Sequence, residues 1–122
     1  MGLRTLALVS GIYDLLLAFP LLFAAGTMAH AFGAPAPQPL VNAQLNGVFT
    51  LSLAAGYFWA AADVQARRGY LWVAGVLAKG LGSALFVVDH YAHGSPAPFL
   101  LFAATDGALA LLTAFLLSRR SG

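Results

Sequence analysis

The sequence predicts an all-α fold, a transmembrane four-helix bundle in one domain, and three observations favour it. Of the 122 residues, 61% are hydrophobic and only 8% are charged, with a mean hydropathy of +0.84. A soluble domain carries about 25% charged residues, so most of this surface cannot face water. Four apolar segments also approach the roughly 20 residues that a membrane-spanning helix needs.

Composition excludes several other classes. The chain has no cysteine, so disulfides and thiolate metal sites are excluded. The net charge of +2 is too small and too scattered to predict nucleic acid as a partner. We expect membrane lipid to surround the protein. A homo-oligomer or a larger membrane complex is the further partner that a bundle of this size suggests.

The predicted spans use up nearly the whole chain. They cover residues 3–25, 42–62, 70–88 and 97–117. The first could instead be a cleaved signal peptide, because Arg4 gives it a basic start and Ala29-His30-Ala31 fits a cleavage site. Its apolar run is longer than a signal core, however, and Asp14 lies in the middle, so we expect a retained span.

The positive charges predict the orientation. With four spans, all arginines fall on one side of the membrane, and the two remaining loops hold no Lys or Arg. The positive-inside rule makes the arginine side cytoplasmic, with both termini there, in the bacterial inner (plasma) membrane. The proline-rich APAPQP segment at residues 34–39 should cross the outer surface as an extended link. The orienting residues are Arg4, Arg67, Arg68, Arg119 and Arg120.

Three charged residues lie deep within predicted spans. Asp14, Lys79 and Asp106 are each roughly 12 to 18 Å into the bilayer, counted from the span boundaries. An isolated charge there costs at least about 2.5 to 3.5 kcal/mol, so we expect the three side chains to face inward and meet. If all are ionised the cluster carries one surplus negative charge. Either one aspartate is protonated, or a proton or cation joins the site.

Polar residues on the second span extend this candidate site. Asn46, Thr50 and Tyr57 recur at helical spacing and are expected to line the approach to the cluster from outside. The ligand- or proton-binding site predicted from the sequence therefore combines these three residues with the charged cluster. The alternative is that the cluster only fixes which helices pair and binds nothing.

The segment VVDHYAHG ends the third span with an acid and two histidines. Asp89, His90 and His93, with His30 from the first outer loop, form a polar cluster on the predicted outer face. Three interpretations stay open: a metal site, a protonation switch, or the polar end of a helix capped by Gly94. No signature motif supports a metal, so no metal, cofactor or catalytic residue is predicted.

Four segments carry a family resemblance. GIYDLLLAFPLLF, LNGVF, LAKGLGSALF and TDGALALLTAFLL, one from each span, resemble small four-span bacterial inner-membrane proteins of uncharacterised function. The general plan is similar to the DoxX-like group. This sequence differs from the DoxX pattern in having Gly56 and Tyr57, not an acid, in the middle of span two. The resemblance implies the four-span fold and the membrane location.

Three functional hypotheses follow. The first is a transporter-like protein that binds a proton or small ligand at Asp14, Lys79 and Asp106. The second is an accessory or assembly subunit, which would contact another chain through the small residues between Gly75 and Gly82 or through the apolar stripe of span four. The third is a metal-dependent enzyme at the outer face, for which the sequence offers no nucleophile with an adjacent base.

Overall fold

The computed structural model describes residues 2–119, which are mostly helical and contain no strand. Met1 and residues 120–122 lie outside this range, and with them Arg120, one of the residues used to predict the orientation. The elements in chain order are α1 (Leu3–Phe23), α2 (Ala25–Ala31), α3 (Leu40–Ala62), α4 (Arg68–Tyr70), the π-helix η1 (Leu71–Ala78), α5 (Lys79–His93), the 3₁₀-helix η2 (Ala97–Phe99) and α6 (Leu100–Ser118).

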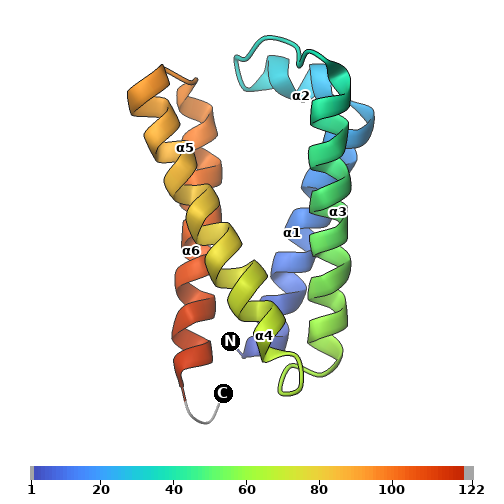
Figure 1. The fold of residues 1–122 in the computed structure, drawn as a ribbon, viewed down its shortest axis with the longest axis vertical. Helices are drawn as coiled ribbons and strands as arrows, with labels where there is room; N and C mark the ends of the chain where they lie inside the picture. Colours follow the sequence, from blue (N-terminus) through green and yellow to red (C-terminus); the bar gives the residue numbers. More distant parts are fainter. Residues whose placement is uncertain (1, 120–122) are drawn as a thin grey trace.

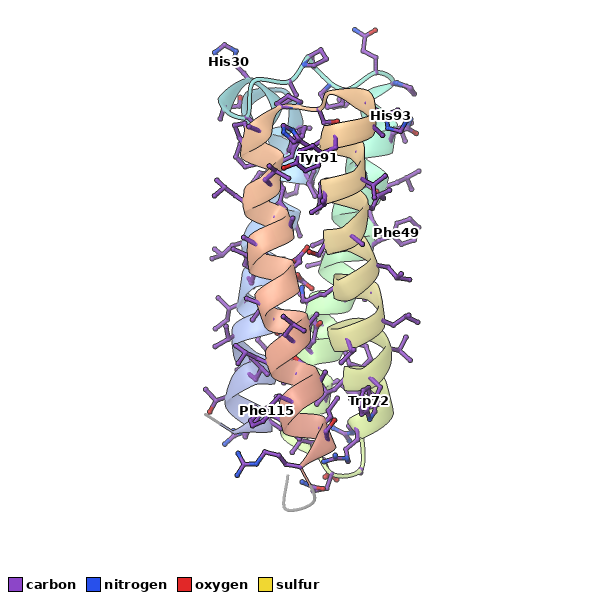
Figure 2. The ribbon with its side chains drawn as sticks, turned by 90° about the vertical axis from the view of Figure 1, so that its left-hand side faces the viewer. His30, Phe49, Trp72, Tyr91, His93 and Phe115 are labelled. Atoms are coloured by element: carbon purple, nitrogen blue, oxygen red, sulfur yellow. The ribbon has the colours of Figure 1, made fainter. Side chains whose placement is uncertain are left out.

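Four helical segments are long and apolar enough to cross a membrane, which confirms the predicted number of spans. They are Leu3–Phe23, Leu40–Ala62, Arg68–His93 and Ala97–Ser118. The third is longer than predicted, so Asp89, His90 and His93 belong to its last turns. Large apolar side chains such as Phe49, Trp72 and Phe115 are exposed on the bundle surface, as expected where lipid replaces water (Figure 2).

The four long segments form two pairs that diverge. α1 packs along α3, and η1 with α5 packs along α6. Figure 1 shows the pairs meeting near α4 and spreading apart toward α2. We call these the α4 end and the α2 end of the bundle. α1 begins at Leu3 and α6 ends at Ser118, and both of these residues lie at the α4 end.

A continuous hydrophobic core holds the pairs together at the α4 end. Its buried members come from all four long segments: Leu3, Leu6, Ala7, Tyr57, Ala60, Ala61, Leu71, Ala74, Leu116 and Leu117. Two side chains from α4 add polar contacts there. The Arg68 guanidinium donates to the Leu117 carbonyl, and the Tyr70 hydroxyl donates to the Leu53 carbonyl. The two helix pairs are therefore packed against each other at the α4 end.

Two elements were not predicted from the sequence. α1 ends at Phe23, and after Ala24 the short helix α2 turns across the α2 end. The sequence predicts a kink at Pro20 and a span that runs on to residue 25, so the break at Ala24 was not predicted. The extended segment 34–39 follows α2 as expected, without helical structure. The second unpredicted element is η1, whose wider i→i+5 turns directly precede Lys79.

Close approach of η1 to α6 depends on Gly75. A Cβ at this position would lie 2.9 Å from Thr113 Cγ2. Thr113 is β-branched and its hydroxyl donates to the Leu109 carbonyl at 2.7 Å, so it cannot move aside freely. We expect Gly75→Ala to lower the free energy of unfolding in bicelles by about 1–3 kcal/mol.

Gly82→Ala is the matched control for that change. A Cβ at residue 82 meets nothing within 4 Å. The control should be neutral or stabilising by up to about 1 kcal/mol, because alanine favours a helix over glycine. Equal effects of the two substitutions would contradict the close contact at Gly75.

Candidate functional site

The structure brings Asp14, Lys79 and Asp106 together between the two helix pairs. Lys79 Nζ donates a hydrogen bond to Asp14 Oδ1 at 2.8 Å, and the side chains are only 8% and 6% exposed. Asp106 Oδ1 lies 3.6 Å from the same nitrogen, which is an ion pair beyond hydrogen-bond length. One ammonium therefore faces two carboxylates that come from α1 and α6.

Small residues beside the charged ones let four helices approach this point, α1 with α3 and α5 with α6. A Cβ at Gly11 would lie 3.1 Å from the Phe58 ring, so α1 and α3 are in tight contact about one turn before Asp14. A Cβ at Gly107 would lie 2.9 Å from Ser83 Oγ, beside Asp106. Ser83 in turn donates to the Ala103 carbonyl at 2.7 Å, which joins α5 to α6.

Two tyrosine rings complete the surroundings of the ammonium. Lys79 Nζ lies 5.2 Å from the centroid of Tyr13 and 5.4 Å from that of Tyr57. Both distances allow cation–π attraction. The Tyr13 hydroxyl is hydrogen-bonded to Thr105 Oγ1 at 2.5 Å, which fixes its ring beside the site. The positive charge is thus enclosed by two carboxylates and two aromatic faces.

Several buried polar atoms at the site have no hydrogen-bond partner among the described residues. They are Ser10 Oγ, Asp14 Oδ2, Tyr57 OH and Asp106 Oδ1. Buried polar groups are nearly always paired, because each unpaired one costs its full desolvation energy. The two carboxylate oxygens are acceptors. The site therefore has more acceptor atoms than Lys79 alone can satisfy, and it carries one surplus negative charge when both carboxylates are ionised.

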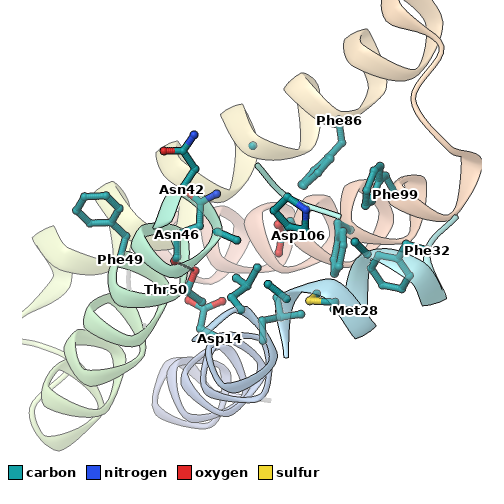
Figure 3. Close-up of a pocket in the computed structure, with 18 of the residues that line it drawn as sticks. Asp14, Met28, Phe32, Asn42, Asn46, Phe49, Thr50, Phe86, Phe99 and Asp106 are labelled. Atoms are coloured by element: carbon teal, nitrogen blue, oxygen red, sulfur yellow. Dashed lines mark hydrogen bonds between the residues drawn. The ribbon is translucent and has the colours of Figure 1, made fainter. Parts of the chain in front are cut away.

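A cavity of about 830 Å³ opens from this cluster toward the α2 end (Figure 3). Asp14, Lys79 and Asp106 line it where the helix pairs converge. Exposed lining residues such as Asn42 and Asn46 show that it reaches the surface. The wall formed by α2, α5, η2 and α6 is mostly apolar and aromatic, and it includes Met28, Phe32, Leu85, Phe86, Phe99 and Phe102.

The predicted polar approach is found in part. Asn46 and Thr50 line the cavity on α3, and the Thr50 hydroxyl donates to the Asn46 carbonyl at 2.7 Å. Tyr57 does not line the cavity. It is 1% exposed, belongs to the core of the α4 end, and touches the site only through the face it presents to Lys79. The aromatic wall is the part that sequence reasoning missed, although Phe99, Phe102 and Asp106 share a helical face.

The residues of the predicted outer-face cluster are engaged in local contacts. His93 Nδ1 lies 3.0 Å from Asp89 Oδ1, the Ser95 hydroxyl donates to Asp89 Oδ2, and His90 Nδ1 lies 2.7 Å from the Ser95 carbonyl oxygen. His30 lies on α2, away from His93 (Figure 2). No group of three His, Cys, Asp or Glu residues within 2–119 is arranged to hold a metal ion. These contacts fit the polar end of a helix, closed by Gly94 at φ 72°.

One of the two surfaces expected of an accessory subunit, the small residues of the third span, is used within the chain, whereas α6 leaves Leu101, Leu111 and Phe115 exposed. Gly75 faces Thr113, and a Cβ at Gly80 would lie 4.0 Å from Ala110 Cβ, both on α6. Gly82 lines the cavity. The small residues of the third span therefore pack two helices of the same chain and make room for the cavity.

Compared with protein-family models, curated proteins and solved structures, the chain matches none. The likeness to the DoxX-like group thus stays a prediction from the sequence. The functional argument rests on the site itself.

Proposed function

We propose that this chain is a transporter-like protein of the bacterial inner membrane that binds a small ligand or a proton at Asp14, Lys79 and Asp106. One observation carries the proposal. A largely apolar cavity ends on Asp14, whose side chain is almost fully buried and whose Oδ2 accepts no hydrogen bond. A buried, unpaired carboxylate on a side chain that lines a space large enough for a small molecule is suited to receive a ligand.

A purely structural cluster would be built differently. Charged residues that only hold helices together are expected to satisfy one another, because an unpaired buried charge is strongly destabilising. Protein interiors are also closely packed, and an unfilled space lowers stability. Here one ammonium serves two carboxylates, and the cluster lies at the base of a cavity. Both features favour a binding role.

The orientation is part of the proposal. The described arginines Arg4, Arg67, Arg68 and Arg119 belong to segments at the α4 end, which supports a cytoplasmic α4 end and cytoplasmic termini. The cavity then opens on the outer side. Rocking of the α1–α3 pair against the α5–α6 pair would close it there and expose the cluster to the cytoplasm, as in alternating access.

Cysteine accessibility tests this proposal, and the cysteine-free chain is its own background. Four single variants are treated in intact cells with a membrane-impermeant thiol reagent. We expect Ala36→Cys in the outer link and Ala78→Cys in the cavity to react, and Ala66→Cys near the arginines to react only after lysis. Leu81→Cys, which is exposed toward lipid and does not line the cavity, is the matched control for Ala78→Cys.

Two results would contradict the proposal. Reaction of Ala66→Cys in intact cells with protection of Ala36→Cys would reverse the orientation. Equal protection of Ala78→Cys and Leu81→Cys would mean that no water-accessible cavity reaches the charged cluster, and the binding function would fail with it.

A further inference from the structure

We infer that the ligand is a hydrophobic monovalent cation, such as a protonated or quaternary amine with an apolar body. The inference rests on the proposed function, because it names the class of ligand for the same cavity. It is argued from the charge of the cluster, the free acceptor atoms, the chemistry of the cavity wall and the size of the space.

The charge of the cluster favours a cation over an anion. Asp14, Asp106 and Lys79 sum to one negative charge when all three are ionised. Lys79 is the one cation among the described residues that lines the cavity, and it already faces both carboxylates and the Tyr13 and Tyr57 rings. The two unpaired hydroxyls near this point, Ser10 Oγ and Tyr57 OH, do not line the cavity, and an anionic ligand would meet the surplus negative charge.

The unpaired atoms that belong to cavity-lining residues are carboxylate acceptors, which suits an onium or ammonium group. Asp14 is 4% exposed, lines the cavity, and leaves Oδ2 without a partner. Asp106 Oδ1 also accepts no hydrogen bond and is 3.6 Å from Lys79 Nζ. A second cation placed beside these two atoms would neutralise the cluster without displacing Lys79 from Asp14 Oδ1.

The wall of the cavity selects an apolar ligand body. Phe32, Phe86, Phe99 and Phe102 form one group of rings, with centroids 5.0 Å apart for Phe32 and Phe102 and 5.5 Å for Phe86 and Phe102. Aromatic faces attract organic cations as well as burying apolar groups. Phe102 lies one turn from Asp106, so the ring group and the carboxylates can act on the same molecule.

The same features disfavour a divalent inorganic ion. Hard cations such as Ca²⁺ need six or more oxygen ligands and Mg²⁺ a regular octahedron. Two free carboxylate oxygens beside an apolar wall do not supply such a shell. The volume of about 830 Å³ instead lies within the roughly 300–1,000 Å³ typical of sites for drug-sized molecules.

The test compares two probes of nearly equal shape and opposite charge. Tetraphenylphosphonium and tetraphenylborate are titrated against the purified full chain in nanodiscs, with empty nanodiscs to subtract partition into lipid. We expect the phosphonium to bind at least tenfold more tightly than the borate. Asp106→Asn should weaken phosphonium binding by tenfold or more, because it removes the surplus charge while the Lys79–Asp14 hydrogen bond stays. Asp63→Asn, an exposed acid outside the cavity, is the matched control and should bind as the wild type does.

A second measurement needs no variant and so does not depend on how Asp106→Asn folds. A proton on either carboxylate cancels the surplus charge, so phosphonium affinity should fall as the pH is lowered, by up to about tenfold per pH unit. The ionisable groups around these carboxylates are Tyr13 on α1, Tyr57 on α3, Tyr70 on α4 and Lys79 on α5. Phosphonium binding that stays constant from neutral to acidic pH would overturn the inference.

The remaining outcomes separate this inference from the proposed function. If tetraphenylborate binds at least as tightly and protects Ala78→Cys from modification, the cavity binds ligands but the class is wrong. If neither probe binds above empty nanodiscs and neither slows modification of Ala78→Cys, the ligand class is overturned, and equal protection of Ala78→Cys and Leu81→Cys would overturn the binding function as well.

Discussion

Replacing Lys79 with methionine should lower the free energy of unfolding by about 3–5 kcal/mol, because it leaves two buried carboxylates without their positive partner. Asp14 and Asp106 both pair with this one nitrogen. No other cation within residues 2–119 lies within ion-pair distance of either carboxylate. Methionine keeps the length and the apolar stem of the side chain, so the loss would reflect charge and hydrogen bonding. Reversible unfolding in bicelles, followed by circular dichroism, measures it.

The two aspartates should respond differently. Asp14→Asn removes the acceptor of the 2.8 Å hydrogen bond and should cost about 1–3 kcal/mol. The double variant with Asp14→Asn and Lys79→Met should lose less free energy of unfolding than the sum of the two single losses. The coupling energy should be about 1–3 kcal/mol, since the residues are in direct contact. Purely additive effects would contradict the ion pair.

Asp106→Asn is the informative member of the series. Lys79 keeps its bond to Asp14 in this variant, and the cluster loses its surplus negative charge. We expect the variant to be neutral or more stable than the wild type. That result would mean that the chain keeps a charge that does not help it fold, which is expected of a binding site. A loss as large as that of Asp14→Asn would instead make Asp106 part of the interhelical contact.

The location of the charged cluster could be predicted because the physics of charge in a bilayer leaves few alternatives. Three ionisable residues on three spans are costly unless they meet, and Asp14, Lys79 and Asp106 do meet. The number of spans could also be predicted, because prolines and charges separate the apolar runs. Both conclusions depend on composition and position along each helix, and not on how the helices pack.

The face that Tyr57 occupies could not be predicted, because it depends on the divergence of the helix pairs. Asn46, Thr50 and Tyr57 follow one helical stripe, but α3 lies beside a cavity at the first two and inside a packed core at the third. Contact of Gly11 with Phe58 and Tyr57 shows where α1 closes onto α3. A stripe gives the direction of a side chain, and only the packing decides whether it meets a space or another helix.

The outer-face residues could be placed only in part. The predicted apolar span ended at residue 88, and of the three interpretations of VVDHYAHG only the capped helix end extended the helix to Gly94. The helix does continue to His93, so Asp89 and His93, four residues apart, share a face and pair. η1 was not predicted because its sequence, LWVAGVLA, is apolar on every side and carries no periodic pattern that would reveal a wider turn.

Filling the cavity from Gly82 should abolish binding without disturbing the fold. Space around a Cβ at this position is open, and the residue lines the cavity one turn beyond Ala78. Helical side chains tilt toward the N-terminus of the helix, so the ring in Gly82→Phe should cover Ala78 and Lys79. We expect phosphonium binding and the modification rate of Ala78→Cys each to fall by at least tenfold.

Stability and a matched variant make that result specific. Phenylalanine is more favourable than glycine within a helix, so the free energy of unfolding of Gly82→Phe should stay the same or rise. Leu81→Phe places the same ring on the neighbouring residue, which is 63% exposed and does not line the cavity, and it should leave binding unchanged. If Gly82→Phe is stable and still binds the phosphonium as the wild type does, the ligand lies elsewhere. Because this variant leaves Asp14, Lys79 and Asp106 intact, it separates the role of the space from the role of the charges.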